Sequence, residues 1–154
     1  MRPSFDGCVA ICIAALERRW EVSRGLRNHN PGNIRRSASR FRGEVRPSTD
    51  PAFKQFEEPA WGYRAIFVIL RTYYDRHHLH TMQEMIRRWA PPVENHTEAY
   101  IRGVTALTGL APDAEIRPED RSSMVAMAAA ISEIENGKPA DLTALAEGWK
   151  RYIS

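Results

Sequence analysis

Glu135 is the residue of this chain best placed for acid–base chemistry. The apolar residues before it recur at helical spacing and predict a buried stripe made of Met124, Met127, Ala128, Ile131 and Ile134. Glu135 follows Ile131 by one helical turn, so its carboxyl group is expected at the inner edge, whereas Glu133 points away. A carboxyl group partly removed from water can hold a proton and donate it to a leaving group. The alternative is a carboxylate that only orders the helix end.

Two turn-forming segments could surround such an acid. The first runs from Arg24 to Arg35, where Asn-Pro-Gly forces a turn and leaves amide side chains able to bond the backbone or a ligand. The second runs from Arg88 to Tyr100, where two consecutive prolines stop one helix and Asn95 can start another. Two such joints in one short chain predict a groove.

Together these segments resemble a family of phage-encoded wall-degrading proteins with a lysozyme-like fold, which are sometimes described as phage structural proteins and are related to lytic transglycosylases. The resemblance covers about Arg24 to Trp149. It implies an enzyme that cleaves the MurNAc–GlcNAc bond of peptidoglycan, with no cofactor and no metal. It also implies a place in the phage virion or the host cytoplasm, with action on the periplasmic wall, and virion components as further partners.

The resemblance extends to the catalytic Glu. Ile134 to Gly137 looks like the Val-Glu-Ser-Gly pattern that carries this residue in lytic transglycosylases, at a helix end. Those enzymes place the catalytic helix before the turn motif, so the order here implies a circular permutation in which Asn28 to Ile34 pack beside Glu135. One Glu suffices for a transglycosylase, because the muramyl 6-hydroxyl rather than water completes the reaction.

Polar residues of both segments are the candidate substrate-binding groups. In the first segment the asparagine amides suit N-acetyl groups and sugar hydroxyls, and Gly32 allows close backbone approach. In the second segment the role is implied by the resemblance, since transglycosylases place a Tyr or an amide near the cleaved bond. The residues assigned to this role are Asn28, Asn30, Asn33, Glu94, Asn95, Thr97 and Tyr100. Turn building by the asparagines, capping by Asn95 and core packing by Tyr100 are the alternatives.

Glu17 is the second candidate for the acid. The stretch from Ala14 to Trp20 resembles the Ala-Leu-Glu-Ser-Gly-Trp sequence of flagellar-type glucosaminidases, which would make the enzyme a muramidase or glucosaminidase hydrolase with an unpermuted order. Arg18 and Arg19 replace the small residues found beside that acid. An ordinary helix-face carboxylate paired with an arginine is the alternative.

A second function competes with glycan cleavage. Five arginines between Arg35 and Arg46 could bind phosphates in a nucleic-acid or virion-assembly module. No nucleic-acid motif accompanies them, so we do not expect nucleic acid as the partner.

A third function is that of a peptidoglycan endopeptidase, which would require zinc or a Cys–His pair. Cys8 and Cys12 are predicted to be buried thiols, and the histidines lack ligand spacing, so no metal is expected.

The composition predicts one globular domain. The chain has 154 residues, of which 43% are hydrophobic and 27% charged, with a formal net charge of +3. This charge favours polyanions as partners, including nucleic acid and the carboxylates of a bacterial wall.

The apolar run from Gly7 to Leu16 is too short to span a bilayer and lacks a convincing signal-peptide cleavage site. We expect a monomer with an N-terminal helical extension over 1–23 and a lysozyme-like domain over 24–154.

Helical periodicity and punctuation predict a mainly α fold with one small β-hairpin or irregular excursion between Ile34 and Phe56. Thr81 with Glu84, and Asn95 with Glu98, have the spacing of capping boxes. Asp141 is expected to cap the last helix. The predicted helices run over Val9 to Val22, Trp61 to about Arg76 after Pro59, Thr81 to Trp89, Asn95 to Thr108, and from Pro118 to Gly137.

Overall fold

The computed structural model describes residues 22–92 and 96–154. They are mainly helical with one two-stranded antiparallel sheet, which confirms the expected mainly α class with one small β excursion. The elements are α2 (Arg24–Arg27), β1 (Glu44–Val45), β2 (Gln55–Phe56), α3 (Pro59–His77), α4 (Met82–Trp89), α5 (Thr97–Thr108), α6 (Arg121–Asn136) and α7 (Leu142–Ile153). Cys8, Cys12, Glu17, Glu94 and Asn95 lie outside the described residues, as does nearly all of the helix expected over Val9 to Val22.

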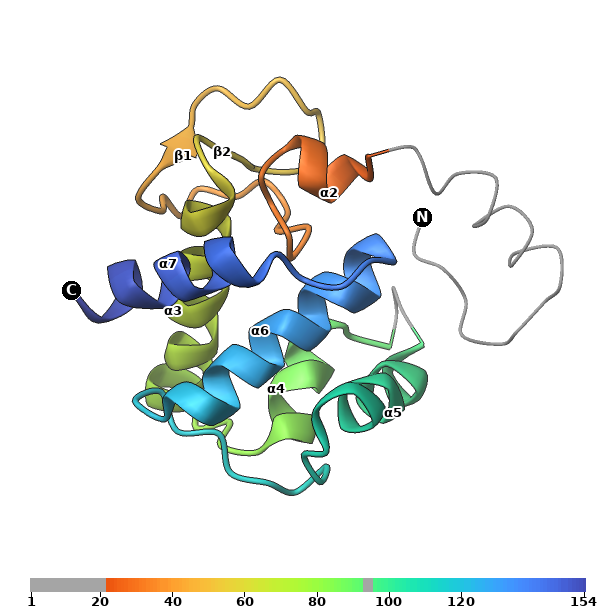
Figure 1. Ribbon diagram of the computed structural model, residues 1–154. Coiled ribbons are helices and arrows are strands. Elements are labelled where there is room, and N and C mark those ends of the chain that lie inside the picture. Colours follow the sequence, from red (N-terminus) through yellow and green to blue (C-terminus); the bar gives the residue numbers. More distant parts are fainter. Residues whose placement is uncertain (1–21, 93–95) are drawn as a thin grey trace, which may run out of the picture.

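The helices surround one hydrophobic core. In Figure 1, α6 lies between α3 and α5, α7 crosses α3, and α2 and the hairpin lie beyond the N-terminal end of α3. The core takes fully buried side chains from α3, α4, α5 and α6, among them Ile66, Ile86, Val104 and Ile131. Every residue of the stripe predicted on α6 is buried. The inner face of α6 therefore lies where the sequence placed it.

Local signals set most helix boundaries as expected. Thr81 and Glu84 form a reciprocal capping box at the start of α4. Asp141 accepts a hydrogen bond from the backbone N–H of Ala144 and caps α7. The helices α5 and α6 end at Gly109 and Gly137, both with left-handed backbone angles that favour glycine.

One expectation about the turn segments was wrong, and one short element was not expected. The unexpected element is the single turn of α2, which begins after the non-helical residues Val22 and Ser23 and is capped by the Ser23 hydroxyl, the acceptor of the Leu26 backbone N–H. Glu98 was expected as the third residue of a capping box. The helix α5 starts at Thr97, which makes Glu98 its second residue, and the Glu98 side chain instead forms an ion pair with Arg87.

A buried ion pair stabilises the β excursion. Glu44 pairs with Phe56 and Val45 with Gln55 in the antiparallel register. Lys54 is 1% exposed, and its Nζ donates to Glu44 Oε1 at 2.8 Å and to the carbonyl oxygens of Ser37 and Ser39. All three ammonium hydrogens thus have acceptors, which offsets the cost of burying the charge.

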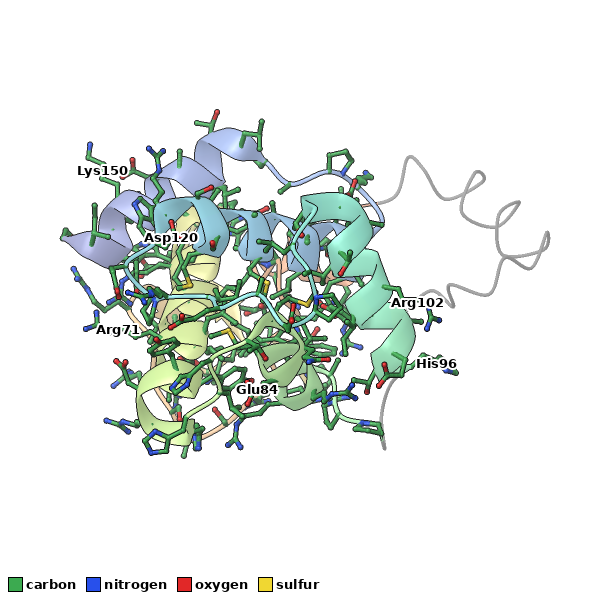
Figure 2. All side chains as sticks on the ribbon, turned by 90° about the horizontal axis from the view of Figure 1, so that it is seen from below. Arg71, Glu84, His96, Arg102, Asp120 and Lys150 are labelled. Atoms are coloured by element: carbon green, nitrogen blue, oxygen red, sulfur yellow. The ribbon has the colours of Figure 1, made fainter. Side chains whose placement is uncertain are left out.

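Charged side chains cover the outside of the helical bundle. Figure 2 shows Arg71, Arg102 and Lys150 pointing outward, and all three are exposed. Within the described residues, no helix combines the length and the apolar character that a membrane span requires.

Candidate active site

Glu135 lies one residue before the end of α6 and faces inward. Only 7% of the residue is exposed, and Ile131, one turn earlier, is fully buried. The chain leaves the helix at Gly137, which adopts a φ of 71°. The carboxyl group is therefore removed from most solvent while it remains at the margin of the core, which is the placement that a proton donor needs.

Both carboxylate oxygens of Glu135 accept hydrogen bonds from the two turn-forming segments. The Asn33 amide donates to Oε1 at 3.1 Å, and the Tyr100 hydroxyl donates to Oε2 at 2.9 Å. Asn33 belongs to the turn after α2, and Tyr100, which is 2% exposed, belongs to α5. The structure thus brings together Glu135, Asn33 and Tyr100, which the sequence indicated as separate candidates. The Asn28 to Ile34 segment packs beside Glu135, as expected.

Asn30 builds the turn that presents Asn33. Its amide nitrogen donates to the carbonyls of Ile34 and Lys54, and its amide oxygen accepts the backbone N–H of Ile34. Asn30 is 0% exposed, so the structure places it inside the turn rather than beside Glu135, and its role in substrate binding stays a prediction. Asn33 itself adopts a left-handed φ of 48°, which asparagine tolerates better than most residues.

Asn136 ties the turn to the end of α6. Its Nδ2 donates to the carbonyl of Pro31 at 2.8 Å, and its Oδ1 accepts from the Ser23 hydroxyl at 2.7 Å. Gly25 completes this contact, because a Cβ there would lie 2.6 Å from both Asn136 Oδ1 and Asn33 Oδ1. The sequence alone assigned no role to these residues, although Asn136 lies in the Ile134 to Gly137 segment that resembles the Val-Glu-Ser-Gly pattern.

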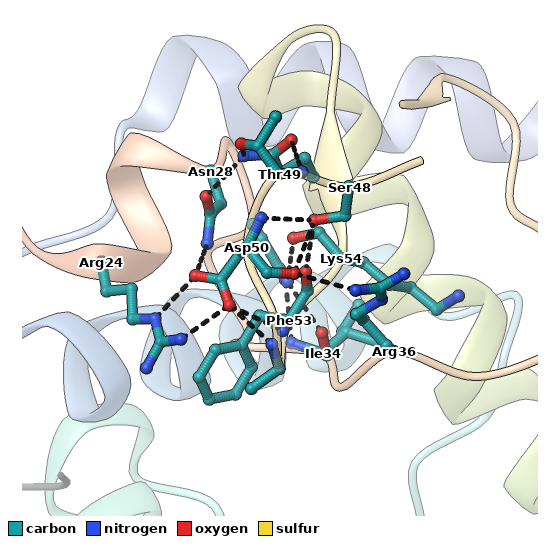
Figure 3. Close-up of polar contacts among 12 residues, drawn as sticks. Arg24, Asn28, Ile34, Arg36, Ser48, Thr49, Asp50, Phe53 and Lys54 are labelled. Carbon is teal, nitrogen blue, oxygen red and sulfur yellow. Dashed lines mark hydrogen bonds and ion pairs between the residues drawn. The ribbon is translucent and has the colours of Figure 1, made fainter. Parts of the chain in front are cut away.

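Asp50 organises the polar network on the other side of the turn, shown in Figure 3. Its carboxylate accepts a bidentate pair of hydrogen bonds from Arg24 and a third from Asn28 Nδ2 at 3.0 Å. The Arg24 guanidinium is the main reason that the pKa of Asp50 lies well below its usual range. Asn28 also accepts from Gln55 and is buried, so the structure places it in this network rather than beside Glu135, and its role in substrate binding stays a prediction.

The second segment positions Tyr100. Thr97 is buried, and its hydroxyl donates to the carbonyl of Ala90, which joins the start of α5 to the end of α4. The structure therefore shows Thr97 in the joint between the two helices, and its role in substrate binding stays a prediction. The Trp89 ring packs against Gly32, where a Cβ would lie 2.9 Å from Trp89 Cζ2, so the two segments meet directly.

Most of the arginines between Arg35 and Arg46 contact other residues of the hairpin region and so stabilise its fold. Arg46 forms an ion pair with Glu44 and donates to the carbonyls of Ser37 and Ser39. Arg36 donates to the carbonyl of Asp50, and Arg35 lies over the Phe53 ring. These side chains contribute to the hairpin fold, which weakens the argument for a phosphate-binding surface.

In the described part of the chain, Glu135 belongs neither to a metal site nor to the apolar groove. Among the described residues, no group of three His, Cys, Asp or Glu side chains is arranged to hold a metal ion. A groove of about 340 Å³ is lined mainly by apolar residues of α5, α6, the following loop and the start of α7, including Leu107, Ala129 and Leu142, and also by Glu133. This groove opens on the side of α6 that carries Glu133, so it is not part of the Glu135 site.

A known phage protein is similar to this chain over most of its length. The chain is 38% identical over 120 residues to Protein P5 of Pseudoalteromonas phage PM2. The matched region spans 76% of this chain and 73% of that protein. No family model matches the chain.

Proposed function

The chain belongs to the family that includes Protein P5 of Pseudoalteromonas phage PM2, and we propose that it serves a phage by degrading bacterial peptidoglycan. The reaction is cleavage of the MurNAc–GlcNAc bond, by the non-hydrolytic route of a lytic transglycosylase. The observation that carries this proposal is a buried Glu135 whose two carboxylate oxygens are held by Asn33 and Tyr100.

In the proposed mechanism Glu135 acts first as an acid and then as a base. It protonates the glycosidic oxygen as the bond to the leaving sugar breaks, and it then accepts the proton of the muramyl 6-hydroxyl as that oxygen attacks the anomeric carbon. The product is an anhydromuramyl end. Because the same carboxyl group gives and takes the proton, this route requires no second carboxylate.

The two hydrogen-bond partners suit both protonation states. A tyrosine hydroxyl donates to a carboxylate, and it can also accept a hydrogen bond from a carboxylic acid. The Asn33 amide keeps donating to the opposite oxygen in either state. Such a fixed orientation of the reacting carboxyl group lowers the reorganisation needed during the reaction.

Mass spectrometry of muropeptides released from purified peptidoglycan tests the proposal. We expect anhydromuramyl products from the wild type and about a thousandfold slower release by Glu135→Gln, which cannot transfer a proton. Glu133→Gln is the matched control, since it changes a half-buried Glu two residues earlier on the same helix. The products also decide between reactions: reducing sugars indicate a hydrolase and free amines an endopeptidase.

Glu17→Gln belongs in the same experiment because Glu17 is the competing acid. Loss of product with Glu17→Gln but not with Glu135→Gln would move the active site to the N-terminal region. If the folded wild type releases no product at all, the proposed enzyme is rejected. The arginine-rich stretch as a nucleic-acid or virion-assembly module then becomes the leading hypothesis.

A further inference from the structure

A second polar site surrounds Trp61, near the N-terminal end of α3. The guanidinium of Arg42, from the turn before β1, lies 5.3 Å from the centre of the Trp61 ring system, and that of Arg151, from α7, lies 4.5 Å from it. Two residues later on α3, Tyr63 is hydrogen-bonded to Ser132 of α6. Residues two apart on a helix point in nearly opposite directions, so Trp61 faces away from the Glu135 site.

Gly43 fixes Arg42 in this position. A Cβ at Gly43 would lie 2.1 Å from Trp61 Cγ, so the backbone of the turn contacts the indole directly. Gly43 has a φ of 75°, and its carbonyl accepts the backbone N–H of Glu57 at 2.8 Å. The placement of Arg42 over the ring therefore follows from backbone packing as well as from the cation–π contact.

Arg64, one turn after Trp61, is a cation that the fold does not neutralise. Within residues 22–92 and 96–154 it has no hydrogen bond or ion pair to its side chain, and its Nε is buried without an acceptor. Burial, and then the nearby positive charge of Arg42, lower the pKa of Arg64. Trp61 and Arg64 are three residues apart on α3 and therefore neighbours on one face of the helix, and Arg42 lies over the Trp61 ring. A buried donor without an acceptor costs stability, and a ligand that supplied the acceptor would remove this cost.

Arg151 shows the contrast within the same cluster. Its guanidinium forms ion pairs with Glu58 at 2.7 Å and Glu147 at 3.2 Å, although its Nη1 is buried without an acceptor. These two carboxylates place negative charge at the edge of the site. A phosphate backbone would meet repulsion there, whereas one small oxyanion can reach Arg42 and Arg64.

We propose that Arg42 and Arg64 bind a single carboxylate of a peptidoglycan peptide stem, with the Trp61 ring contacting the adjoining apolar part of the peptide. Paired guanidiniums recognise a carboxylate through charge-assisted hydrogen bonds. The inference rests on the proposed function for the identity of the polymer. It gives the protein a stem-binding site on the side of α3 opposite the Glu135 site.

Co-sedimentation with purified cell walls tests the site, with Glu135→Gln as the background so that the wall is not degraded. Two wall preparations are compared, one with intact peptide stems and one from which an amidase has removed them. We expect Arg42→Gln and Arg64→Gln each to weaken binding to the intact wall about tenfold, and to leave binding to the stripped glycan unchanged. Arg102→Gln, which removes an exposed charge from α5, is the matched control.

Equal losses on both wall preparations, or an equal loss with Arg102→Gln, would overturn the inference by indicating general charge attraction. Loss of duplex DNA binding with no change in wall binding would assign the site to nucleic acid. Thermal unfolding tests whether the variants fold. Arg64→Gln removes a cation that the fold does not neutralise, so it is expected to leave the melting temperature unchanged or raised. A lowered melting temperature with unchanged stem binding would make the arginines structural and would also overturn the inference.

A soluble probe separates this site from the proposed function. Titration of the wild type with a synthetic stem tetrapeptide is followed through the NMR signal of the Trp61 indole N–H, with acetate as the simple carboxylate. A shift with the peptide in a protein that releases no muropeptides would support the site and reject the enzyme. Muropeptide release without any shift, with peptide or acetate, would support the enzyme and reject the site.

Discussion

Asn33 donates its side-chain amide to Glu135 across 102 residues of sequence, with an N–O distance of 3.1 Å. The contact joins the turn after α2 to the C-terminal end of α6. It orients a buried carboxyl group from a segment in which the backbone itself is constrained, since Asn33 has a φ of 48° and Asn30 is fully buried. The candidate acid is therefore held by rigid parts of the fold.

Asn33→Asp is expected to reduce muropeptide release about a hundredfold, because a carboxylate would replace the donor and repel Glu135. Asp keeps the size of the side chain and tolerates the left-handed backbone. Asn33→Gly removes the amide without adding charge and should cost less. Equal initial rates for wild type and Asn33→Asp, measured by the same release assay, would remove Asn33 from the site.

Tyr100→Phe is expected to slow the reaction about tenfold, because Glu135 Oε2 loses its hydrogen-bond donor while the ring still fills the core. The free energy of unfolding should fall by about 1 kcal/mol, as for a buried hydrogen bond. Tyr74→Phe is the control, since it removes another Tyr–Glu hydrogen bond, to Glu115, at an exposed position. A similar loss of rate in both variants would argue against a specific role for Tyr100.

Gly25→Ala is expected to lower both activity and stability. Alanine favours a helix more than glycine does, so intrinsic propensity alone predicts a more stable protein, by about 1 kcal/mol. The added Cβ would instead contact the side-chain oxygens of Asn33 and Asn136 at 2.6 Å and push them from their positions. Thermal unfolding and muropeptide release measured on one preparation will show which effect dominates; a raised melting temperature with full activity would contradict the close contact.

Asp50 is expected to make the protein sensitive to acid. Its pKa is lowered in the folded state, chiefly by Arg24, so its stabilising effect is complete above the unfolded-state pKa of about 3.9 and is lost as the pH falls toward the lower folded-state value. The melting temperature should therefore fall below about pH 4. Asp50→Asn should lower it at neutral pH and weaken this acid dependence, as calorimetry across the pH range can measure.

Asp75→Asn is the control for Asp50, because Asp75 also pairs with an arginine but on an exposed helix face. An exposed pair contributes little to stability, so its removal should leave the pH profile nearly unchanged. If Asp50→Asn and Asp75→Asn give the same profile as the wild type, the network around Asp50 does not stabilise the hairpin.

Local sequence signals were sufficient for most of the helix boundaries. The capping box at Thr81, the glycine at the end of α6 and the apolar stripe before Glu135 each depend on residues a few positions apart, so their outcome could be predicted. The inward direction of Glu135 follows from that same periodicity. The start of α5 could not be predicted, because it depends on a contact between Thr97 and Ala90, across the joint between two helices.

Only the tertiary structure decided which polar residues serve the site and which build the scaffold. Asn28, Asn30 and Asn33 are equivalent as amides in the sequence, yet the first two bond within the turn and hairpin and only Asn33 reaches Glu135. The sequence determined the helices and the inward carboxyl group, since helical periodicity is local. The partners of a side chain depend on segments brought together by packing, as the sequence separation of 102 between Asn33 and Glu135 demonstrates.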